Sequence, residues 1–223
     1  MNKSRRKTLR QLFAIGLLGS SGIPGLIRDA LAAGNMPAPQ GIYKIRGEVR
    51  INGKAAKDGQ LVNPGDEVVT GPRSTATYVI GQSAFLQREN SVVHFGQKAA
   101  EDFFRVVTGK ILSVFGSGEK KLLTPTASIG IRGTACYIEA EAKKVYFCLC
   151  YGMADVFPAA EPGRVDRIET KHHDHPIYIH HDTGMPSMVD ATVINHTDVE
   201  LVMLEDLTGR RPPFYGKANG VTY

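Results

Sequence analysis

From about residue 42 onward, apolar and polar positions alternate in short runs separated by glycine-rich turns. Runs such as STATYVI, SAFLQ and SVVHF are rich in Thr, Val, Tyr and Phe. Alternation with a period of two is typical of β strands. No apolar stripe with a 3.6-residue period precedes residue 190. The pattern therefore predicts an all-β unit, which can be a sandwich, a barrel or a solenoid-like stack.

Turn sequences show where the chain reverses direction between neighbouring strands. Asn52-Gly53 follows an alternating run and is a common dipeptide of two-residue hairpins. Pro64-Gly65 is typical of a type II turn, because Pro presets the first central φ and Gly accepts a positive second φ. The run DFFRVVTGKILSVF is consistent with a hairpin around Gly109 or with a short helix, and its β-branched residues favour strands.

The clearest predicted hairpin holds all three cysteines of the chain. One strand is expected at 134–141 and its return at 145–151. With a three-residue loop between them, Cys136 would face Cys150. Cys136, Cys148 and Cys150 would then share one face, because side chains alternate along a strand. A one-residue difference in register would remove this arrangement.

The first 32 residues have the composition of a targeting segment. Arg5 and Arg6 precede a short, glycine-containing apolar run, and Ala30 and Ala32 fit the −3 and −1 positions of a signal peptidase site. The pattern resembles a twin-arginine export signal, with an ordinary Sec signal or an uncleaved anchor as alternatives. Its apolar run is shorter than the roughly 20 residues that span a bilayer. We therefore expect a periplasmic protein that is soluble after cleavage and has no transmembrane span.

Composition divides the remaining chain into three parts. A flexible linker is expected at 33–41, a β domain at 42–155 and a histidine-rich extension at 156–223. In the extension we expect further strands, and residues 200–208 can form one short helix that ends before Gly209.

Charge argues against nucleic acid as a partner. Residues 1–32 contain six of the 27 Lys and Arg and one of the 22 Asp and Glu, so 21 of each remain. The remaining chain is therefore formally neutral and shows no strong basic cluster, whereas a nucleic-acid-binding surface needs one.

The segment LTPTASIGIRGTACYIE resembles the hallmark sequence of FecR-type domains. Upstream, GEVRINGKAAKDGQLVNPGDEVVTG resembles the start of the same domain, so the likeness covers about residues 45–155. The hallmark positions are Thr124, Pro125, Gly130, Ile131, Arg132, Gly133 and Thr134.

Membership in that family would imply an extracytoplasmic β-rich domain whose strands stack in a solenoid-like or jelly-roll-like manner. Its best-known members are periplasmic parts of iron-siderophore signal transducers, which bind an outer-membrane receptor and pass its signal to a sigma factor. Here an export signal is expected where those proteins have a cytoplasmic anti-sigma segment and a membrane span. The resemblance therefore implies the fold and the location rather than that transmembrane role.

Three residues of the hallmark also have physical interpretations of their own. Gly130 and Gly133 suit a backbone with positive φ or a close backbone approach. The guanidinium of Arg132 can tether the turn by binding carbonyl groups of neighbouring strands, or it can bind a partner.

Cysteines and histidines form the main candidate for chemistry, because thiolate and imidazole are good ligands for zinc, copper or iron. Two alternatives stay open. Cys136 and Cys150 can form a disulfide in an oxidising compartment, and buried cysteines can pack as small apolar groups. The candidate residues are Cys136, Cys148, Cys150, His172, His173 and His175.

The sequence contains no nucleophile elbow, P-loop, dinucleotide fingerprint or His-Glu-x-x-His motif. We therefore expect a non-catalytic module that binds a small ligand or an envelope protein in sensing or envelope regulation. The alternative is a metal-binding or redox-active periplasmic protein that uses the three cysteines with His172 and His173. Thiol-dependent catalysis is a third, weaker hypothesis. The sequence leaves the oligomeric state open.

Overall fold

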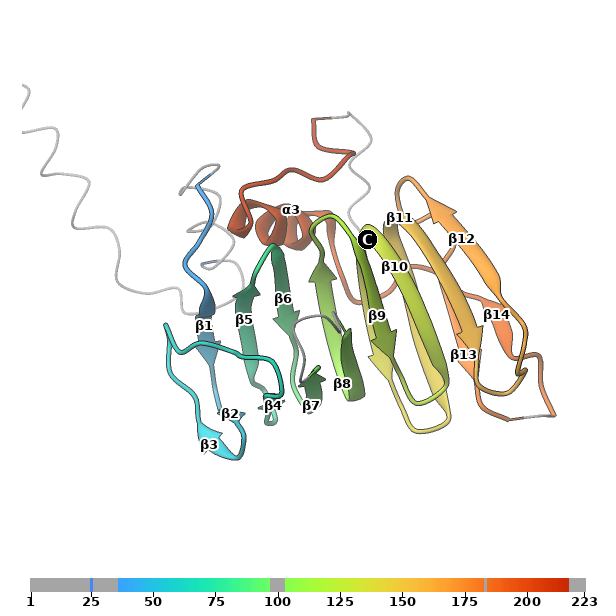
Figure 1. The fold of residues 1–223 in the computed structure, drawn as a ribbon, viewed down its shortest axis with the longest axis horizontal. Helices are drawn as coiled ribbons and strands as arrows, with labels where there is room; N and C mark the ends of the chain where they lie inside the picture. Colours follow the sequence, from blue (N-terminus) through green and yellow to red (C-terminus); the bar gives the residue numbers. More distant parts are fainter. Residues whose placement is uncertain (1–24, 26–35, 97–102, 183, 217–223) are drawn as a thin grey trace, which may run out of the picture.

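The computed structural model describes residues 25, 36–96, 103–182 and 184–216. The predicted targeting residues Arg5, Arg6, Ala30 and Ala32 lie outside that part of the chain. Strands dominate the described residues, and α3 (Asp198–Leu207) is a helix of ten residues (Figure 1). The predicted all-β fold class with a short C-terminal helix is confirmed. Within the described ranges, no helix has the length and apolar character that a bilayer crossing requires.

Fourteen strands follow one another along the described residues. Their bounds are β1 (Gly41–Arg46), β2 (Val49–Ile51), β3 (Lys54–Ala55), β4 (Glu67–Thr70), β5 (Thr75–Ile80), β6 (Ser83–Gln87), β7 (Ser91–Phe95), β8 (Phe103–Val114), β9 (Glu119–Leu123), β10 (Ala127–Ala140), β11 (Lys144–Pro158), β12 (Asp166–Thr170), β13 (Ile177–His180) and β14 (Met188–Asp190).

The strands form two layers that share three long strands. β8, β10 and β11 each pair with different neighbours along their two halves. One layer combines one half of each long strand with β1, β5, β6, β13 and β14. The other layer combines the remaining halves with β2, β3, β4, β7, β9 and β12. The strands lie side by side along the long axis of the molecule (Figure 1).

A glycine with positive φ marks the place where each long strand passes from one layer to the other. The φ angles are 91° at Gly109 in β8, 53° at Gly133 in β10 and 99° at Gly152 in β11. Glycine adopts such angles without the steric cost that a Cβ brings. The conformational freedom expected at Gly133 is therefore confirmed, whereas Gly130 lies in regular strand backbone, where the expectation of positive φ is wrong.

The turn predictions had mixed outcomes. Asn52 and Gly53 both have positive φ between β2 and β3, and Gly65 has a φ of 90° in the turn before β4, so both turns are confirmed. The hairpin predicted around Gly109 is wrong, because β8 continues through that residue as a single strand. A positive-φ glycine can bend a strand as well as reverse it, and here it bends the strand.

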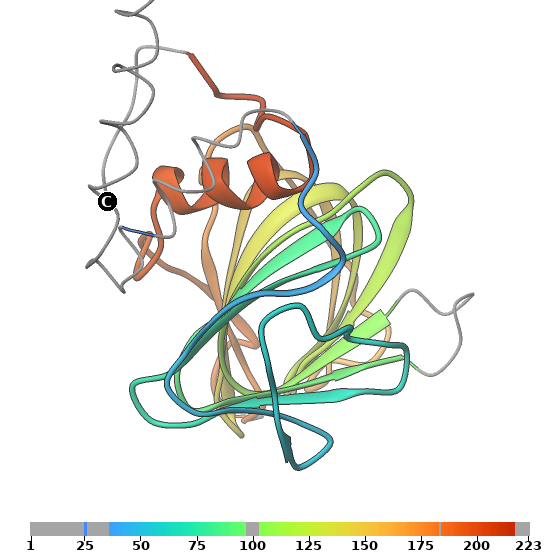
Figure 2. The ribbon, with the colours of Figure 1, turned by 90° about the vertical axis from the view of Figure 1, so that its left-hand side faces the viewer.

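Apolar residues form two cores. The first lies between the two layers and includes Ile129, Ile138 and Val156. The second lies on the outer face of the layer that contains β6, where Leu86 and Leu112 belong to the same cluster as apolar residues of α3. Figure 2 shows α3 outside the strand layers, across that face.

The C-terminal residues are continuous with the rest of the fold. The boundary predicted between 42–155 and 156–223 falls inside β11, and both β12 and β13 pair with β11. The short helix predicted at 200–208 is confirmed as α3. It begins at a capping box in which Thr197 and Glu200 exchange side-chain to backbone hydrogen bonds.

Substitution of Gly152 by Ala tests the bend in β11. A Cβ there would lie 2.5 Å from Cγ2 of Thr134, in addition to the strain of a positive φ. Gly163→Ala is the matched control, because Gly163 has a φ of 92° and an added Cβ would meet no atom within 4 Å. We expect backbone strain of about 1–2 kcal/mol in the control and at least about 1 kcal/mol more for Gly152→Ala. Urea unfolding measures both, and equal losses would contradict the close packing at this bend.

Candidate metal centre

The cysteine hairpin forms as expected but with a different register. Ala140 pairs with Val145, and the backbone N–H of Glu141 donates to the carbonyl of Lys144, so the turn is one residue shorter than the three expected. Cys136 therefore lies opposite Leu149, and the predicted pairing of Cys136 with Cys150 is wrong. This one-residue difference places Cys136 on the opposite face, in the core between the layers, where burial raises the pKa of its thiol. All three cysteines are free thiols.

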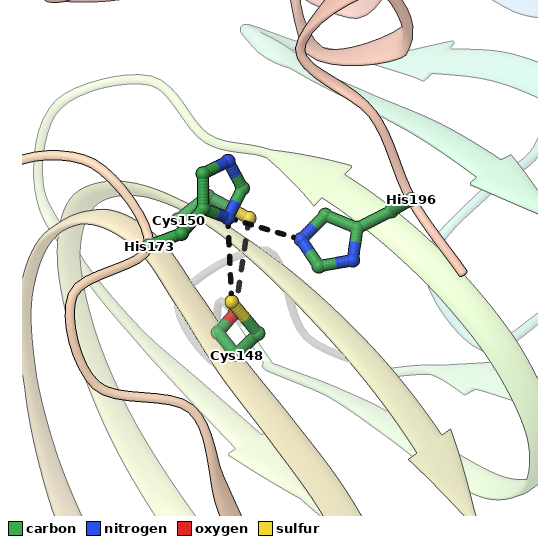
Figure 3. Close-up of side chains that lie close together, drawn as sticks. All are labelled: Cys148, Cys150, His173 and His196. Carbon is green, nitrogen blue, oxygen red and sulfur yellow. Dashed lines mark hydrogen bonds between the residues drawn. The ribbon is translucent and has the colours of Figure 1, made fainter. Parts of the chain in front are cut away.

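Cys148 and Cys150 share the other face of β11 and meet two histidines there. Donor atoms of Cys148, Cys150, His173 and His196 all lie within 4.8 Å of one another (Figure 3). All four residues are buried, with at most 4% of their surface exposed. We call these four residues the Cys2His2 cluster.

Three segments that are distant in sequence contribute to the cluster. The thiols come from β11, and His173 comes from the loop between β12 and β13. The backbone N–H of His173 donates to the carbonyl of Cys150 at 3.0 Å, which attaches this loop to β11. His196 lies two residues before the first residue of α3. The carboxylate of Asp174 accepts the backbone N–H of Lys171 at 2.8 Å and shapes the His173 loop.

Hydrogen bonds on the outer side of each histidine fix where its proton lies. Nδ1 of His196 is 2.7 Å from the carbonyl oxygen of Ile194, and Nε2 of His173 is 3.1 Å from Oδ1 of Asp198. A carbonyl or carboxylate oxygen can only accept, so both of these nitrogens carry hydrogen. In their neutral forms, Nε2 of His196 and Nδ1 of His173 therefore present lone pairs, and both face the interior of the cluster.

The inward-facing atoms are close together. Nδ1 of His173 lies 3.1 Å from Nε2 of His196 and 3.4 Å from Sγ of Cys148. Two lone pairs and a thiolate cannot occupy such a buried space without a cation between them. In the metal-free protein this cation can be a proton on Nδ1 of His173, and a metal ion can replace that proton.

The pKa shifts follow from this arrangement. A hydrogen bond from the thiol of Cys150 lowers the pKa of Cys148 to about 3, with His173 and His196 adding to the effect and burial opposing it. Burial is the main reason that the pKa of Cys150 is raised. The pKa of His173 is also raised: its burial alone would lower it, but the adjacent Cys148 and Asp198 together outweigh that effect.

Two of the donor separations are close to those of a tetrahedral metal site, and all of them are within 4.8 Å. With Zn–N bonds of about 2.0–2.1 Å and Zn–S bonds of about 2.3 Å, a regular tetrahedron has N···N edges of about 3.4 Å and S···N edges of about 3.6 Å. The corresponding separations here are 3.1 and 3.4 Å. Both separations are shorter than in an occupied site, so the two histidine rings must move outward to admit an ion.

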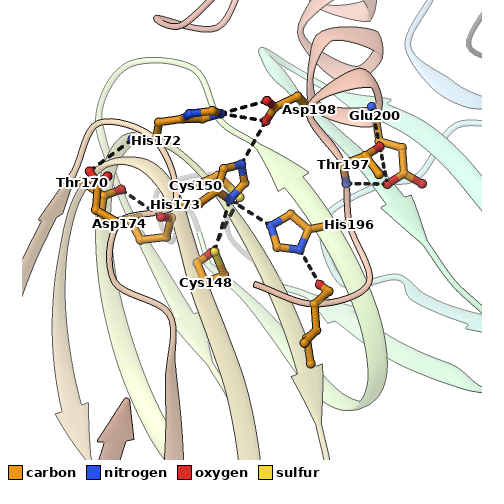
Figure 4. Close-up of polar contacts among 12 residues, drawn as sticks. Cys148, Cys150, Thr170, His172, His173, Asp174, His196, Thr197, Asp198 and Glu200 are labelled. Atoms are coloured by element: carbon orange, nitrogen blue, oxygen red, sulfur yellow. Dashed lines mark hydrogen bonds and ion pairs between the residues drawn. The ribbon is translucent and has the colours of Figure 1, made fainter. Parts of the chain in front are cut away.

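The outer hydrogen bonds resemble those around known metal centres, where a ligating histidine donates its other N–H to a carboxylate or a carbonyl. Asp198 accepts from His173 and also from Nε2 of His172, at 2.9 Å (Figure 4). The ring of Tyr137 stacks on His196 with centroids 4.6 Å apart, which further fixes that ring.

The structure brings together only some of the site residues predicted from the sequence. Cys148, Cys150 and His173 come together, whereas His172 contacts Asp198 instead of the inner face. The half-exposed side chain of His175 lies apart from the cluster, 3.7 Å from Asp190. The hallmark residues Thr124 and Pro125 form the turn before β10, and Arg132 ion-pairs with Glu119 at 2.6 Å.

Sequence reasoning missed His196. The tripeptide Asn195-His196-Thr197 matches a glycosylation sequon, which gives no hint of a metal ligand. A usable signal was present, because Thr197 and Glu200 have the spacing of a capping box. That signal places His196 directly before a helix, although it does not show which surface the helix packs against.

A nucleophilic role is disfavoured by burial. Cys148, His173 and Asp198 follow one another in the order thiol, imidazole and carboxylate, which is also the order of cysteine-dependent enzymes. The thiol and the His173 ring are buried, however, and a nucleophile must reach its substrate. The arrangement is better suited to hold an ion than to attack a substrate.

Comparisons with known proteins add little. No family model and no curated protein matches the chain. Two crystal structures, both described as a "putative anti-sigma factor" from Parabacteroides distasonis, show a weak likeness. The structure at 1.65 Å has a TM-score of 0.47 and 13% identity, covering 56% of this chain and 59% of that one. The structure at 2.50 Å has a TM-score of 0.48 and 12% identity, covering 61% and 70%. Likeness at this level supports no conclusion about function, and the FecR resemblance stays a prediction.

The thiolate of Cys148 should be observable in the metal-free protein. Because its pKa is about 3 instead of the usual 9.0, the thiolate form is favoured at all pH values above 3. We expect thiolate ultraviolet absorbance to persist as the pH falls to about 5, and Cys148→Ser to abolish it. Cys136→Ser is the control and should keep the signal. Loss of the wild-type signal near about pH 8–9, as for an ordinary thiol, would contradict the assignment.

Proposed function

We propose that this chain is a non-catalytic binding module whose ligand is a single transition-metal ion held by the Cys2His2 cluster. One observation carries the proposal. Four buried donors converge from three segments, and the N–H groups of both histidines are held outward by Ile194 and Asp198. The inner face of the cluster thereby presents bare electron pairs, which is the arrangement that a cation requires.

Zinc is the ion that the site suits best among zinc, copper and iron. Two thiolates and two imidazoles in tetrahedral spacing are typical of structural zinc sites. Four protein donors complete such a site without an open position for water or substrate. A closed site favours a structural or sensory role over catalysis. Copper would compete strongly on affinity alone, so the supply of metal contributes to the selectivity.

The resemblance to a twin-arginine signal supports an exported, periplasmic location for this module. That export route carries proteins that have already folded in the cytoplasm. The Cys2His2 cluster exists only in the folded chain, because its ligands come from β11, the loop between β12 and β13 and the segment before α3. Loading in the reducing cytoplasm would protect Cys148 and Cys150 from oxidation before export. Together with the FecR resemblance, this favours a role in envelope sensing with a protein partner.

Metal stoichiometry tests the proposal. Native mass spectrometry of the reduced full chain after zinc loading should show one ion per chain, lost on denaturation. Cys148→Ser and His196→Ala should each weaken zinc affinity, measured by chelator competition, by more than the roughly 10–100-fold that loss of an outer-shell partner costs.

The matched controls are Cys136→Ser and His175→Ala, which change the same residue types outside the cluster. Both should bind zinc like the wild type. If the controls lose zinc as readily as Cys148→Ser, or if the folded wild type takes up none, the proposed function is wrong. Circular dichroism of each variant verifies that it is folded.

A further inference from the structure

The metal ligand His196 and the carboxylate of Asp198 are both attached to α3. Asp198 is the first residue of the helix, and Thr197 is its N-cap. The capping box with Glu200 fixes the backbone across this start, so His196 and Asp198 have little freedom to move independently of the helix. A movement of His196 or Asp198 at the Cys2His2 cluster therefore also moves the start of α3.

The helix depends on its contacts with the sheet. At ten residues it is too short to be stable alone in water. Its apolar residues Leu201, Met203, Leu204 and Leu207 are buried in the outer core. Its two ends are held by different groups. Near its start, Glu200 pairs with Arg88 at 2.9 Å, and near its end the carboxylate of Glu205 accepts from the hydroxyl of Tyr151 in β11.

Asp198 links the helix start to the metal ligands. Its carboxylate accepts N–H groups from His172 and His173, and a negative charge is favourable at a helix N-terminus. Without this acceptor, nothing would hold the proton of His173 on Nε2. The proton could then move to Nδ1, and that tautomer cannot use Nδ1 to bind a metal ion.

We propose that Asp198 is the positioning residue of the Cys2His2 cluster and that zinc binding and docking of α3 on the sheet are coupled through Asp198 and His196. This inference rests on the proposed function and adds a mode of regulation to it. By thermodynamic reciprocity, an ion that binds better when α3 is docked also stabilises the docked helix. When zinc leaves, the start of α3 loses its anchor at His196 and opens more readily, although Glu200 still pairs with Arg88. The end stays held by Glu205 and Tyr151.

Hydrogen exchange of the full chain, with and without zinc, tests the coupling. Amides of 194–204 should exchange at least about tenfold more slowly with zinc bound. Amides of β4, which lies in the other layer and pairs with β2 and β7, should exchange at the same rate in both states. Equal exchange of 194–204 in the two states would overturn the coupling.

Asp198→Asn tests the positioning role. We expect a zinc affinity about 10–100-fold weaker than that of the wild type, because an amide is a weaker acceptor for the N–H of His173. Asp190→Asn, at the exposed partner of His175, is the matched control and should bind zinc like the wild type. Nitrogen NMR of the His173 ring should show a proton on Nε2 in the metal-free wild type and a ring protonated only on Nδ1 in metal-free Asp198→Asn, which a merely structural role would not produce.

The outcomes separate the two proposals. If the wild type binds no zinc, the proposed function and this inference both fail. If the wild type binds zinc and Asp198→Asn binds it equally well with an unchanged tautomer, only the positioning role is overturned. Should Asp198→Asn fail to fold, Asp198→Glu provides a second variant, which keeps the charge and should restore most of the affinity.

Discussion

Electron pairs that face one another in a buried space require a cation between them, and the thiolate of Cys148 meets lone pairs of His173 and His196 on the outer face of β11. The protein fixes this arrangement from outside, since Ile194 and Asp198 accept the N–H groups that His196 and His173 would otherwise be free to turn inward. A proton satisfies part of the requirement and a tetrahedral metal ion satisfies all of it. The proposed metal binding and its coupling to α3 both depend on that constraint.

The fold explains how the donors meet. Because β11 bends at Gly152, its first half belongs to one layer and its second half pairs with β12 in the other. The chain that leaves β12 thus returns beside Cys150, where the backbone of His173 binds it. The outer face of the first half is then covered by the segment that leads into α3, in which Thr192 accepts from the hydroxyl of Tyr146 and His196 lies against Cys148 and Cys150. The helix itself packs on β6 and β8. A bend in one strand, a return loop and a capped helix are sufficient to enclose the cluster.

Much of the fold could be predicted from the sequence, because strand alternation and turn chemistry are local. Such local signals predicted the turns at Asn52-Gly53 and Gly65 and the C-terminal helix. The site was predictable only in part. Cys148, Cys150 and His173 were named, but the inclusion of Cys136 depended on a hairpin register that differs by one residue from the one expected. His196 could not be connected with them, since its contacts arise only when α3 packs on the sheet. The hairpin prediction at Gly109 was wrong for a related reason, because a glycine with positive φ suits either a bend or a reversal of the chain.

X-ray absorption spectroscopy of the zinc-loaded full chain tests the central claim most directly, because it reports the atoms bound to the ion. Coordination by Cys148, Cys150, His173 and His196 predicts two sulfur atoms at about 2.3 Å and two nitrogen atoms at about 2.0–2.1 Å. Multiple scattering from two imidazole rings should accompany them. A first shell of oxygen and nitrogen without sulfur, or with one or three sulfur atoms, would contradict the Cys2His2 assignment.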